Sequence, residues 1–278
     1  MNNKSLYNLK ILLFLILGCI CNKSLSQTNE IGFFLGGSMF QGDVGPQNAE
    51  KSILNTKPVW GLQFKRNLNY HFGVNLSITR GELYSSDDLS NDLFALQKNI
   101  TFKSNITEFG LFLEFNFQPY LTRDPDYNNS TFIFSGITKF YFNPEGQYID
   151  GNWYSLRPLS TEGQESDLYL ARERYKLSGY SIPIGIGYKI NAYEFLTISF
   201  NLGWRITFTD YIDDVSTTYV EESILTELGQ VLADPSENNF NTGFQRGNPY
   251  TNDKYGFLGI SILYSIKDRN KDCDNIVY

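Results

Sequence analysis

The chain has 278 residues, of which 41% are hydrophobic, 16% aromatic and 19% charged, and its formal net charge is -7. The acidic balance and the lack of a basic run argue against a nucleic-acid-binding surface. Phe and Tyr are abundant although the mean hydropathy is only -0.29. This combination argues against a helical membrane protein and is typical of a β-protein whose strands alternate.

The N-terminus has the pattern of an export signal. Lys4 and Lys10 form a basic start, and the apolar run 11–21 is too short to span a bilayer. Small residues at the usual cleavage positions predict processing after Ser26. We therefore expect residues 1–26 to be a signal peptide and the mature protein to be exported.

Cysteine usage leaves two alternatives open. The sequence "ILGC" at 16–19 resembles a lipobox, which would make Cys19 an acylated N-terminus instead. Cleavage after Ser26 would leave Cys273 as the only cysteine of the mature chain. An unpaired cysteine in an exported protein predicts an intermolecular disulfide, with a spare thiol on a loose tail as the alternative.

Eight segments alternate apolar and polar residues with the two-residue period of a β-strand, and they do not show the spacing of a helix. The clearest one carries apolar residues at every second position from Leu196 to Phe208. In chain order, the predicted strands span 30–41, 59–66, 70–79, 108–117, 131–142, 182–189, 196–208 and 256–266.

The connections between these segments alternate in length. The odd-numbered connections are long and the even-numbered ones are short, except that the fourth, 119–130, is longer than ideal. Outer-membrane barrels have short periplasmic turns and long outer loops. The sequence therefore predicts an all-β, eight-stranded antiparallel up-and-down transmembrane β-barrel over 27–267, with long extracellular loops and a periplasmic C-terminal tail, 268–278. A soluble lipocalin-like barrel is the alternative, but its polar outer face would be poorly covered by the Gly, Ser, Thr and Asn found here.

The apolar face of each strand should contact lipid, and the polar face should line the lumen. A charge on the lipid face at mid-bilayer would cost about 2–4 kcal/mol, whereas in the lumen it can pair with an opposite charge. We expect Arg205 to pair with a residue such as Glu114. The predicted lumen charges are Lys65, Glu114, Lys139, Lys189 and Arg205.

Candidate catalytic and metal-binding residues are few. His71 is the only histidine, and a Ser–His hydrolase with Ser77 or Ser199 would need it as the base, but a polar lumen residue is the simpler interpretation. Asp210, Asp213 and Asp214 could hold Ca²⁺. They lack the spacing of an EF-hand, so we expect a solvated, hydrogen-bonding strand end, and no catalytic site, metal or cofactor.

The long outer loops carry residue types that are favoured at protein contacts. We expect them either to bind a partner or to pack on one another as a cap over the barrel. They are Trp153, Tyr154, Arg157 and Arg246.

Five stretches of the chain resemble a known family. They are "EIGFFLGGSMFQGD", "NPEGQYIDGNWYSLRPLSTEGQ", "FTDYIDDVSTTY", "LADPS" and "QRGNP" followed by "YGF". In this order, across residues 30–266, they are similar to the PorG-type outer-membrane barrel of the type IX secretion system of Bacteroidetes.

The resemblance implies a non-catalytic component of the machine that exports proteins and, in gliding bacteria, adhesins. It also implies docking to the periplasmic ring of the lipoprotein PorK and its partner PorN. With both termini in the periplasm, Cys273 would lie where such a ring protein could form a disulfide with it. The alternatives are a binding or uptake barrel whose outer loops capture a ligand, and a lipid-modifying enzyme that uses His71.

Overall fold

The structure, a computed structural model, describes residues 28–46, 55–236 and 239–266. Eight long strands follow the segments in which apolar and polar residues alternate. They are β1 (Thr28–Gln41), β2 (Lys57–Asn67), β3 (Phe72–Ser86), β4 (Thr101–Asn116), β5 (Asn129–Tyr141), β8 (Ser178–Tyr193), β9 (Leu196–Thr207) and β10 (Lys254–Ile266).

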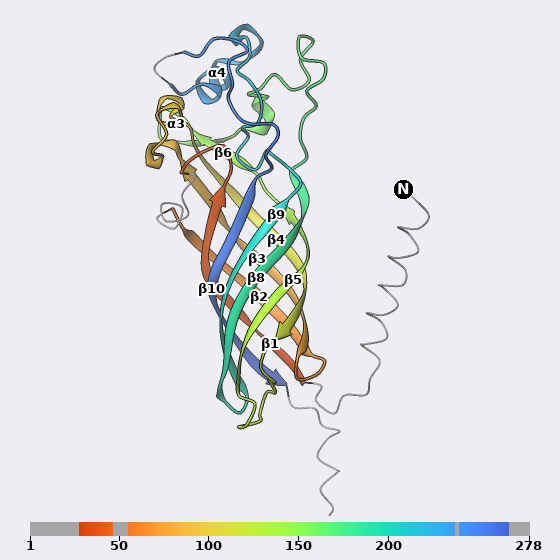
Figure 1. Cartoon of the computed structure of the whole chain (residues 1–278). Coiled ribbons are helices and arrows are strands. Elements are labelled where there is room, and N and C mark those ends of the chain that lie inside the picture. Colours follow the sequence, from red (N-terminus) through yellow and green to blue (C-terminus); the bar gives the residue numbers. More distant parts are fainter. Residues whose placement is uncertain (1–27, 47–54, 237–238, 267–278) are drawn as a thin grey trace, which may run out of the picture.

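These strands form a closed antiparallel barrel (Figure 1). Each strand pairs with the next along the chain, and β1 also pairs with β10, with Phe33 opposite Ile262. Closure leaves no unpaired edge, which a hydrocarbon environment requires. The predicted eight-stranded antiparallel barrel is confirmed.

The barrel wall is apolar outside and polar inside. On β9, for example, Phe200 is 56% exposed, whereas its neighbour Ser199 is 4% exposed and faces the interior. The same alternation places an exposed apolar belt around all eight strands, with polar residues such as Asn75 and Ser261 within. This is the form of an outer-membrane β-barrel, and the protein is one.

Among the described residues, no helix is long and apolar enough to cross a bilayer.

The connections differ between the two ends of the barrel (Figure 1). At one end, four residues join β2 to β3 and two residues join β8 to β9. At the other end lie the long connections, which together we call the cap. It consists of the described parts of 42–46, 87–100, 142–177 and 208–253. Because outer-membrane barrels place their long loops outside the cell, the cap is extracellular.

The cap contains several short elements. A hairpin of β6 (Pro144–Gln147) and β7 (Trp153–Ser155) extends the sheet, because β6 pairs with the upper end of β4. The helical elements are η1 (Asp87–Leu89), α3 (Leu93–Lys98), η2 (Arg157–Leu159), η3 (Glu222–Ile224) and α4 (Glu227–Ala233).

Strands β3 and β4 extend furthest into the cap beyond the bounds that alternation predicted. The predicted strand 70–79 continues to Ser86, and the predicted strand 108–117 begins at Thr101. In these extensions the interior positions become apolar, with Leu83 and Phe102 both fully buried. The strands therefore leave the lipid with their apolar side chains turned inward, which is the opposite of their pattern in the membrane.

Aromatic rings fill much of the barrel interior. Phe132 and Phe134 of β5 lie over glycines of the neighbouring strands, and a Cβ at Gly187 would lie 2.4 Å from Cζ of Phe132. A lumen cavity of about 50 Å³ remains, which has room for a few waters. In the described part of the chain, the barrel interior is therefore a packed core.

Candidate functional site

The end of the lumen nearest the cap holds a buried ion pair. Arg205 of β9 makes two parallel hydrogen bonds with Glu108 of β4, Nε to Oε2 and Nη2 to Oε1, each of 3.0 Å. Tyr255 of β10 donates a third to Glu108 Oε2, at 2.6 Å. Arg205 therefore lies inside the barrel as predicted, but its partner is Glu108 rather than Glu114.

Glu114 belongs to a second buried group nearer the periplasmic end. Its Oε2 accepts hydrogen bonds from the ammonium groups of Lys65 and Lys189, the latter at 3.1 Å. All three residues are buried, at 4% exposure or less. Three of the predicted lumen charges therefore meet in one cluster.

Lys139 does not face the lumen, contrary to the prediction. Its Nζ lies on the outer wall, 5.4 Å from the ring centroid of Tyr141 and 5.6 Å from that of Tyr180. Strand β5 is apolar on both faces, with Phe132 and Phe140 inside and Ile137 outside, so alternation alone did not fix which face holds the lysine.

The periplasmic end of the lumen is closed by the fourth connection, which is longer than a tight turn. Tyr120 from this segment is fully buried, and its hydroxyl donates to Asn191 Oδ1 at 2.5 Å. Thr122 donates to Glu30 Oε1 at 3.0 Å. The additional length of this connection therefore supplies the side chains that plug the barrel.

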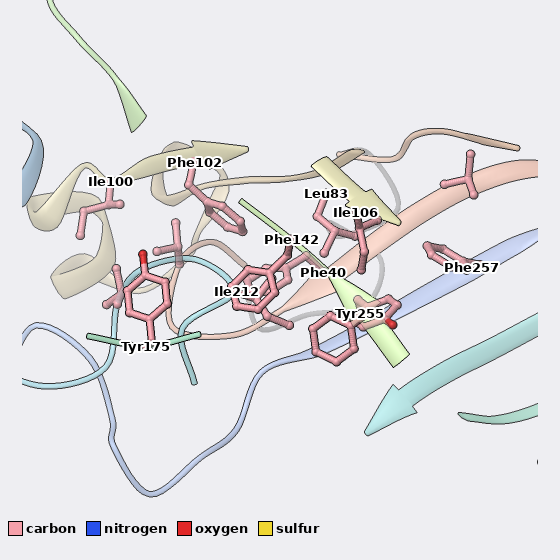
Figure 2. Packing of buried hydrophobic residues seen from close by; sticks show 14 of the residues in the cluster. Phe40, Leu83, Ile100, Phe102, Ile106, Phe142, Tyr175, Ile212, Tyr255 and Phe257 are labelled. Atoms are coloured by element: carbon pink, nitrogen blue, oxygen red, sulfur yellow. The ribbon is translucent and has the colours of Figure 1, made fainter. Parts of the chain in front are cut away.

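The extracellular end is closed by an apolar core within the cap (Figure 2). This core joins the upper ends of the strands to the long loops, so that Phe40 of β1 contacts Phe102 of β4 with ring centroids 4.8 Å apart. Loop residues Tyr175 and Tyr211 stack at 4.7 Å beside it. The buried residues shown here include Phe40, Leu83, Ile100, Phe102, Ile106, Phe142, Tyr175, Ile212, Tyr255 and Phe257.

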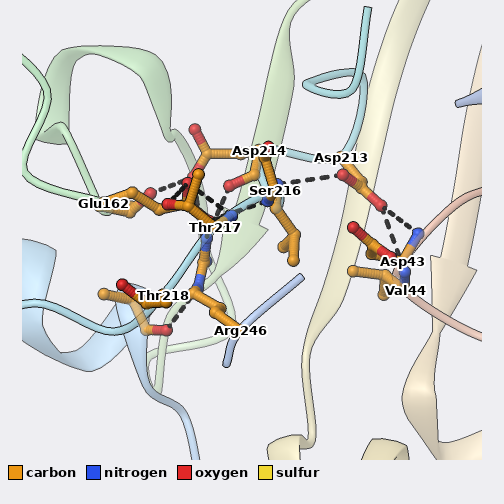
Figure 3. A network of polar contacts seen from close by, with 12 residues as sticks. Asp43, Val44, Glu162, Asp213, Asp214, Ser216, Thr217, Thr218 and Arg246 are labelled. Carbon is orange, nitrogen blue, oxygen red and sulfur yellow. Dashed lines mark hydrogen bonds and ion pairs between the residues drawn. The ribbon is translucent and has the colours of Figure 1, made fainter. Parts of the chain in front are cut away.

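Carboxylates of the cap bind backbone N–H groups of other loops (Figure 3). Asp213 Oδ2 accepts from the N–H groups of Asp43 and Val44, at 3.1 and 3.2 Å. Asp87 accepts from Gly45 at 2.8 Å and from Ile100 at 3.1 Å. Each such carboxylate satisfies donors that a loop cannot pair within itself, so these side chains hold separate loops together.

Arg246 and Glu162 form the centre of this network (Figure 3). Arg246 Nη1 donates to Glu162 Oε1 at 3.1 Å and to the carbonyl of Asp214 at 2.6 Å, and its Nε donates to the carbonyl of Ala233 at 3.0 Å. Glu162 Oε1 also accepts from the N–H of Ser216 at 2.9 Å. One buried guanidinium therefore joins three loop segments.

Burial raises the pKa of several cap carboxylates. Burial raises the pKa of Asp210 to about 7 and that of Asp214 to about 6, although Arg246 counteracts the effect on Asp214. Burial and then the neighbouring Asp43 raise the pKa of Asp213 well above its usual value. Burial and then the neighbouring Asp213 raise the pKa of Asp253 well above its usual value.

The acidic end of β9 is buried, in contrast to the predicted solvated strand end, although it is hydrogen-bonded as predicted. Asp213 and Asp214 are fully buried. Asp213 points toward residues 43–44, whereas Asp214 accepts from Tyr175 at 2.5 Å and from Thr161. Among the described residues, no group of His, Cys, Asp and Glu side chains has the arrangement of a metal site.

His71 lies in the turn between β2 and β3. Its Nδ1 is 2.8 Å from the carbonyl oxygen of Asn116, and its ring stacks on Phe115, which belongs to the outward face of β4. Ser77 and Ser199 point into the lumen. His71 is therefore not a lumen residue, contrary to the prediction, and the proposed Ser–His pairs are not brought together.

The residues predicted to contact a partner occupy different surroundings. Arg246 is 1% exposed, so of the two predicted alternatives it takes the second: it packs within the cap and offers no surface to a partner. Trp153, Tyr154 and Arg157 are half-buried, and Arg157 donates to the carbonyl of Tyr175 at 2.7 Å. Their role in binding a partner stays a prediction.

Cys19, the signal peptide and Cys273 with its tail lie outside the described residues.

The tips of the cap expose apolar side chains that sequence reasoning did not single out. Ile149 is 82% exposed, Leu170 84% and Tyr250 94%. No periodic pattern marks a loop tip, so only the structure separates these residues from the apolar residues of the core.

Comparison with known proteins assigns a family. The family described as "Domain of unknown function (DUF6089)" matches residues 9–275. The chain belongs to the DUF6089 family. No curated protein sequence matches this family member.

Several solved structures are similar to this DUF6089 barrel. Ail of Yersinia pestis matches with 10% identity, a TM-score of 0.41 and coverage of 87% of this chain and 100% of Ail. OprG of Pseudomonas aeruginosa matches with 10% identity, a TM-score of 0.40 and coverage of 88% and 98%. Neisserial surface protein A matches with 7% identity, a TM-score of 0.39 and coverage of 86% and 97%.

Proposed function

We propose that this protein is a structural, non-catalytic outer-membrane component of a type IX protein secretion machine. In this proposal its periplasmic end docks on a ring built from a PorK-like lipoprotein and a PorN-like partner. The cap remains outside the cell and holds the extracellular end closed.

The proposal rests on one observation: the five stretches that resemble the PorG-type family bind one another in the cap. Asp43 comes from the first stretch, Glu162 from the second, Asp213 from the third and Arg246 from the fifth, and these residues bond to one another or to their immediate neighbours. Ala233 of the fourth stretch accepts from Arg246. A chance likeness of five separated stretches has no reason to select residues of one network, so this convergence supports a shared cap architecture.

The packed interior supports a structural role rather than transport through the barrel itself. Buried ion pairs and aromatic rings fill the lumen, and Tyr120 below and the apolar core above close both ends. A barrel of eight strands is about wide enough for side chains to fill. Cargo would therefore pass through a different component of the machine.

The position of His71 supports a non-catalytic role. Catalysis by a Ser–His pair requires the two side chains within hydrogen-bond reach. The ring of His71 instead lies against Phe115 in a turn, and Asn116 occupies its Nδ1.

Site-specific photo-cross-linking in intact envelopes tests the docking. A photoreactive residue at Asp126, which is exposed in the periplasmic connection, should capture the ring proteins, whereas one at Tyr250 in the cap should not. Cargo secretion should also fail when the gene is deleted. Normal secretion together with no ring adduct at Asp126 would reject the proposal.

A ligand-binding barrel is the second candidate, and the exposed tips Ile149, Leu170 and Tyr250 favour it. The same experiment separates the two, because a binding barrel should give an adduct with an external partner at Tyr250. The predicted disulfide of Cys273 adds an independent test. Non-reducing gels should show a high-mass band for the wild type that Cys273→Ser lacks.

A further inference from the structure

Two cations lie on the outer wall at the extracellular edge of the apolar belt. Arg80 of β3 is in register with Thr107 of β4, which is in register with Tyr141 of β5. Lys139 lies two residues along β5 from Tyr141. Because neighbouring strands are about 4.8 Å apart, Arg80 and Lys139 lie on either side of Thr107. Their long side chains can therefore both reach one group placed between them.

Neither cation is neutralised by the protein. The ion pairs in the described part of the chain are made by other bases. Glu82, two residues further along β3, is not paired with Arg80. The described neighbours of Lys139 are the side chains of Tyr141 and Tyr180, neither of which is acidic. A cation that faces lipid is costly at mid-bilayer but is tolerated at the interface, where anionic headgroups lie.

An apolar groove of about 550 Å³ runs along the wall directly below Lys139. Its floor is formed where Ser77, Gly110 and Thr138 turn inward, since they leave only backbone on the outer surface. Its walls are side chains that face hydrocarbon, including Leu62, Leu76, Ile78, Phe109, Leu111 and Ile137, while Lys139 and Tyr180 line its upper end.

We propose that this groove binds a phosphate-bearing lipid of the outer leaflet. One acyl chain lies in the groove, and the phosphate lies between Arg80 and Lys139 with the hydroxyl of Thr107 beside it. A guanidinium and an ammonium group both form strong, charge-assisted hydrogen bonds with phosphate oxygens. The aromatic rings of Trp60, Tyr141 and Tyr180 lie at the headgroup level, where such rings are favoured.

The position of the groove selects a lipid over a protein partner. The groove lies within the belt that faces acyl chains, so a lipid reaches it without desolvating any polar surface. The positive charge is confined to its extracellular end, which matches a molecule with an anionic head and an apolar tail. This inference does not depend on the secretion role.

The test uses the purified mature protein in a non-ionic detergent, with diphosphoryl lipid A as the probe and native mass spectrometry as the readout. The double variant Arg80→Gln/Lys139→Gln should bind lipid A at least about tenfold more weakly than the wild type. The matched control is Lys254→Gln. Lys254 is also exposed at the extracellular end of the outer wall, but on β10, away from the groove, and its loss should leave binding unchanged.

Three results would overturn the proposal: equal binding by the double variant, equal binding of lipid A stripped of its phosphates, or an equal loss in Lys254→Gln. Ile137→Trp fills the groove without changing charge, and it should also weaken binding. This variant keeps the proposal testable if the double variant fails to show the heat-modifiable gel migration of a folded barrel. A second copy of the barrel, detected as a dimer in place of the bound lipid, would count against the lipid.

Discussion

The barrel interior and the cap differ in the balance of their buried carboxylates and cations. Within the described residues, the barrel strands bury three carboxylates, Glu30, Glu108 and Glu114, and three cations, Lys65, Lys189 and Arg205. The cap buries two cations, Lys98 and Arg246, and the carboxylates of Asp87, Glu162, Asp210, Asp213, Asp214 and Asp253. The lumen is balanced, whereas the cap carries an excess of acid.

This difference follows from what surrounds each region. A lipid belt encloses the lumen, whose cavity has room for only a few waters, so an unmatched charge there must find its partner within the protein. The cap is bordered by water, and its carboxylates can bind backbone N–H groups or retain a proton. The two regions should therefore respond differently to loss of a cation and to pH.

The largest effect is expected from Arg205→Ala in the lumen. It leaves Glu108 buried without its bidentate partner, and breaking a buried pair from one side costs about 3–5 kcal/mol. Urea unfolding in lipid vesicles should show this as a lower free energy of unfolding of the whole barrel. Replacing both partners, as in Arg205→Met with Glu108→Leu, should restore most of the lost free energy of unfolding. If Arg205→Ala stayed within about 1 kcal/mol of the wild type, the argument that lumen charges must be paired would be wrong.

Arg246→Ala should be nearly as costly, but only locally. Its loss removes the donor shared by Glu162, Asp214 and Ala233, so the loops should separate while the strands remain paired. Hydrogen exchange should accelerate in 156–177 and 208–236 without acceleration in the barrel strands. Arg157→Ala is the control, because Arg157 is half-buried and makes one backbone contact, and it should have a small effect. Uniform acceleration across the barrel would show that cap and barrel unfold as one unit.

Alternation predicted the barrel because lipid imposes a one-sided pattern on each strand. Segment 196–208 shows it clearly, with apolar residues outside from Leu196 to Ile206. The same rule misplaced Lys139, since β5 is apolar on both faces. It also underestimated the lengths of β3 and β4, where the apolar residues Leu83 and Phe102 turn inward once the strands leave the lipid.

The pairings could not be derived from the sequence for a different reason. Whether Arg205 meets Glu108 or Glu114 depends on the stagger of β4 and β9, which are not adjacent in the barrel. Arg246 and Glu162 are 84 positions apart and lie in loops with no period. The resemblance identified the stretches that contain them, but gave no indication that the stretches bind one another.

The excess of acid in the cap predicts that low pH stabilises it. Asp210 has a pKa raised from 3.8 to about 7. Between these values the folded cap retains a proton that the unfolded chain releases, so stability is greatest below pH 4 and falls as the pH rises toward 7. The slope is at most about 1.4 kcal/mol per pH unit for each such proton. Hydrogen exchange in 208–236, corrected for intrinsic rates, should be faster at pH 8 than at pH 5.5.

Asp210→Asn sharpens this prediction. Both carboxylate oxygens of Asp210 are buried, and the charged neighbours that act on it, Asp43 and Glu162, are acidic, so a neutral amide should slow exchange at pH 8 and weaken its pH dependence. Asp150→Asn is the matched control, because Asp150 lies in the cap but is exposed and should not change the pH dependence. If the pH dependence of hydrogen exchange in Asp210→Asn were unchanged, it would have to come from Asp213, Asp214 or Asp253 instead.

The smallest effect is expected from Lys139→Leu on the outer wall. A cation near the membrane interface costs at most about 1 kcal/mol, so its removal should change the free energy of unfolding in phosphatidylcholine vesicles by no more than that. Lys189→Leu offers the contrast, since it removes one of the two cations that bind Glu114 in the lumen. We therefore expect Lys189→Leu to lower the free energy of unfolding by more than Lys139→Leu. Equal losses in the two variants would contradict the claim that a charge needs its partner in the lumen but not on the outer wall.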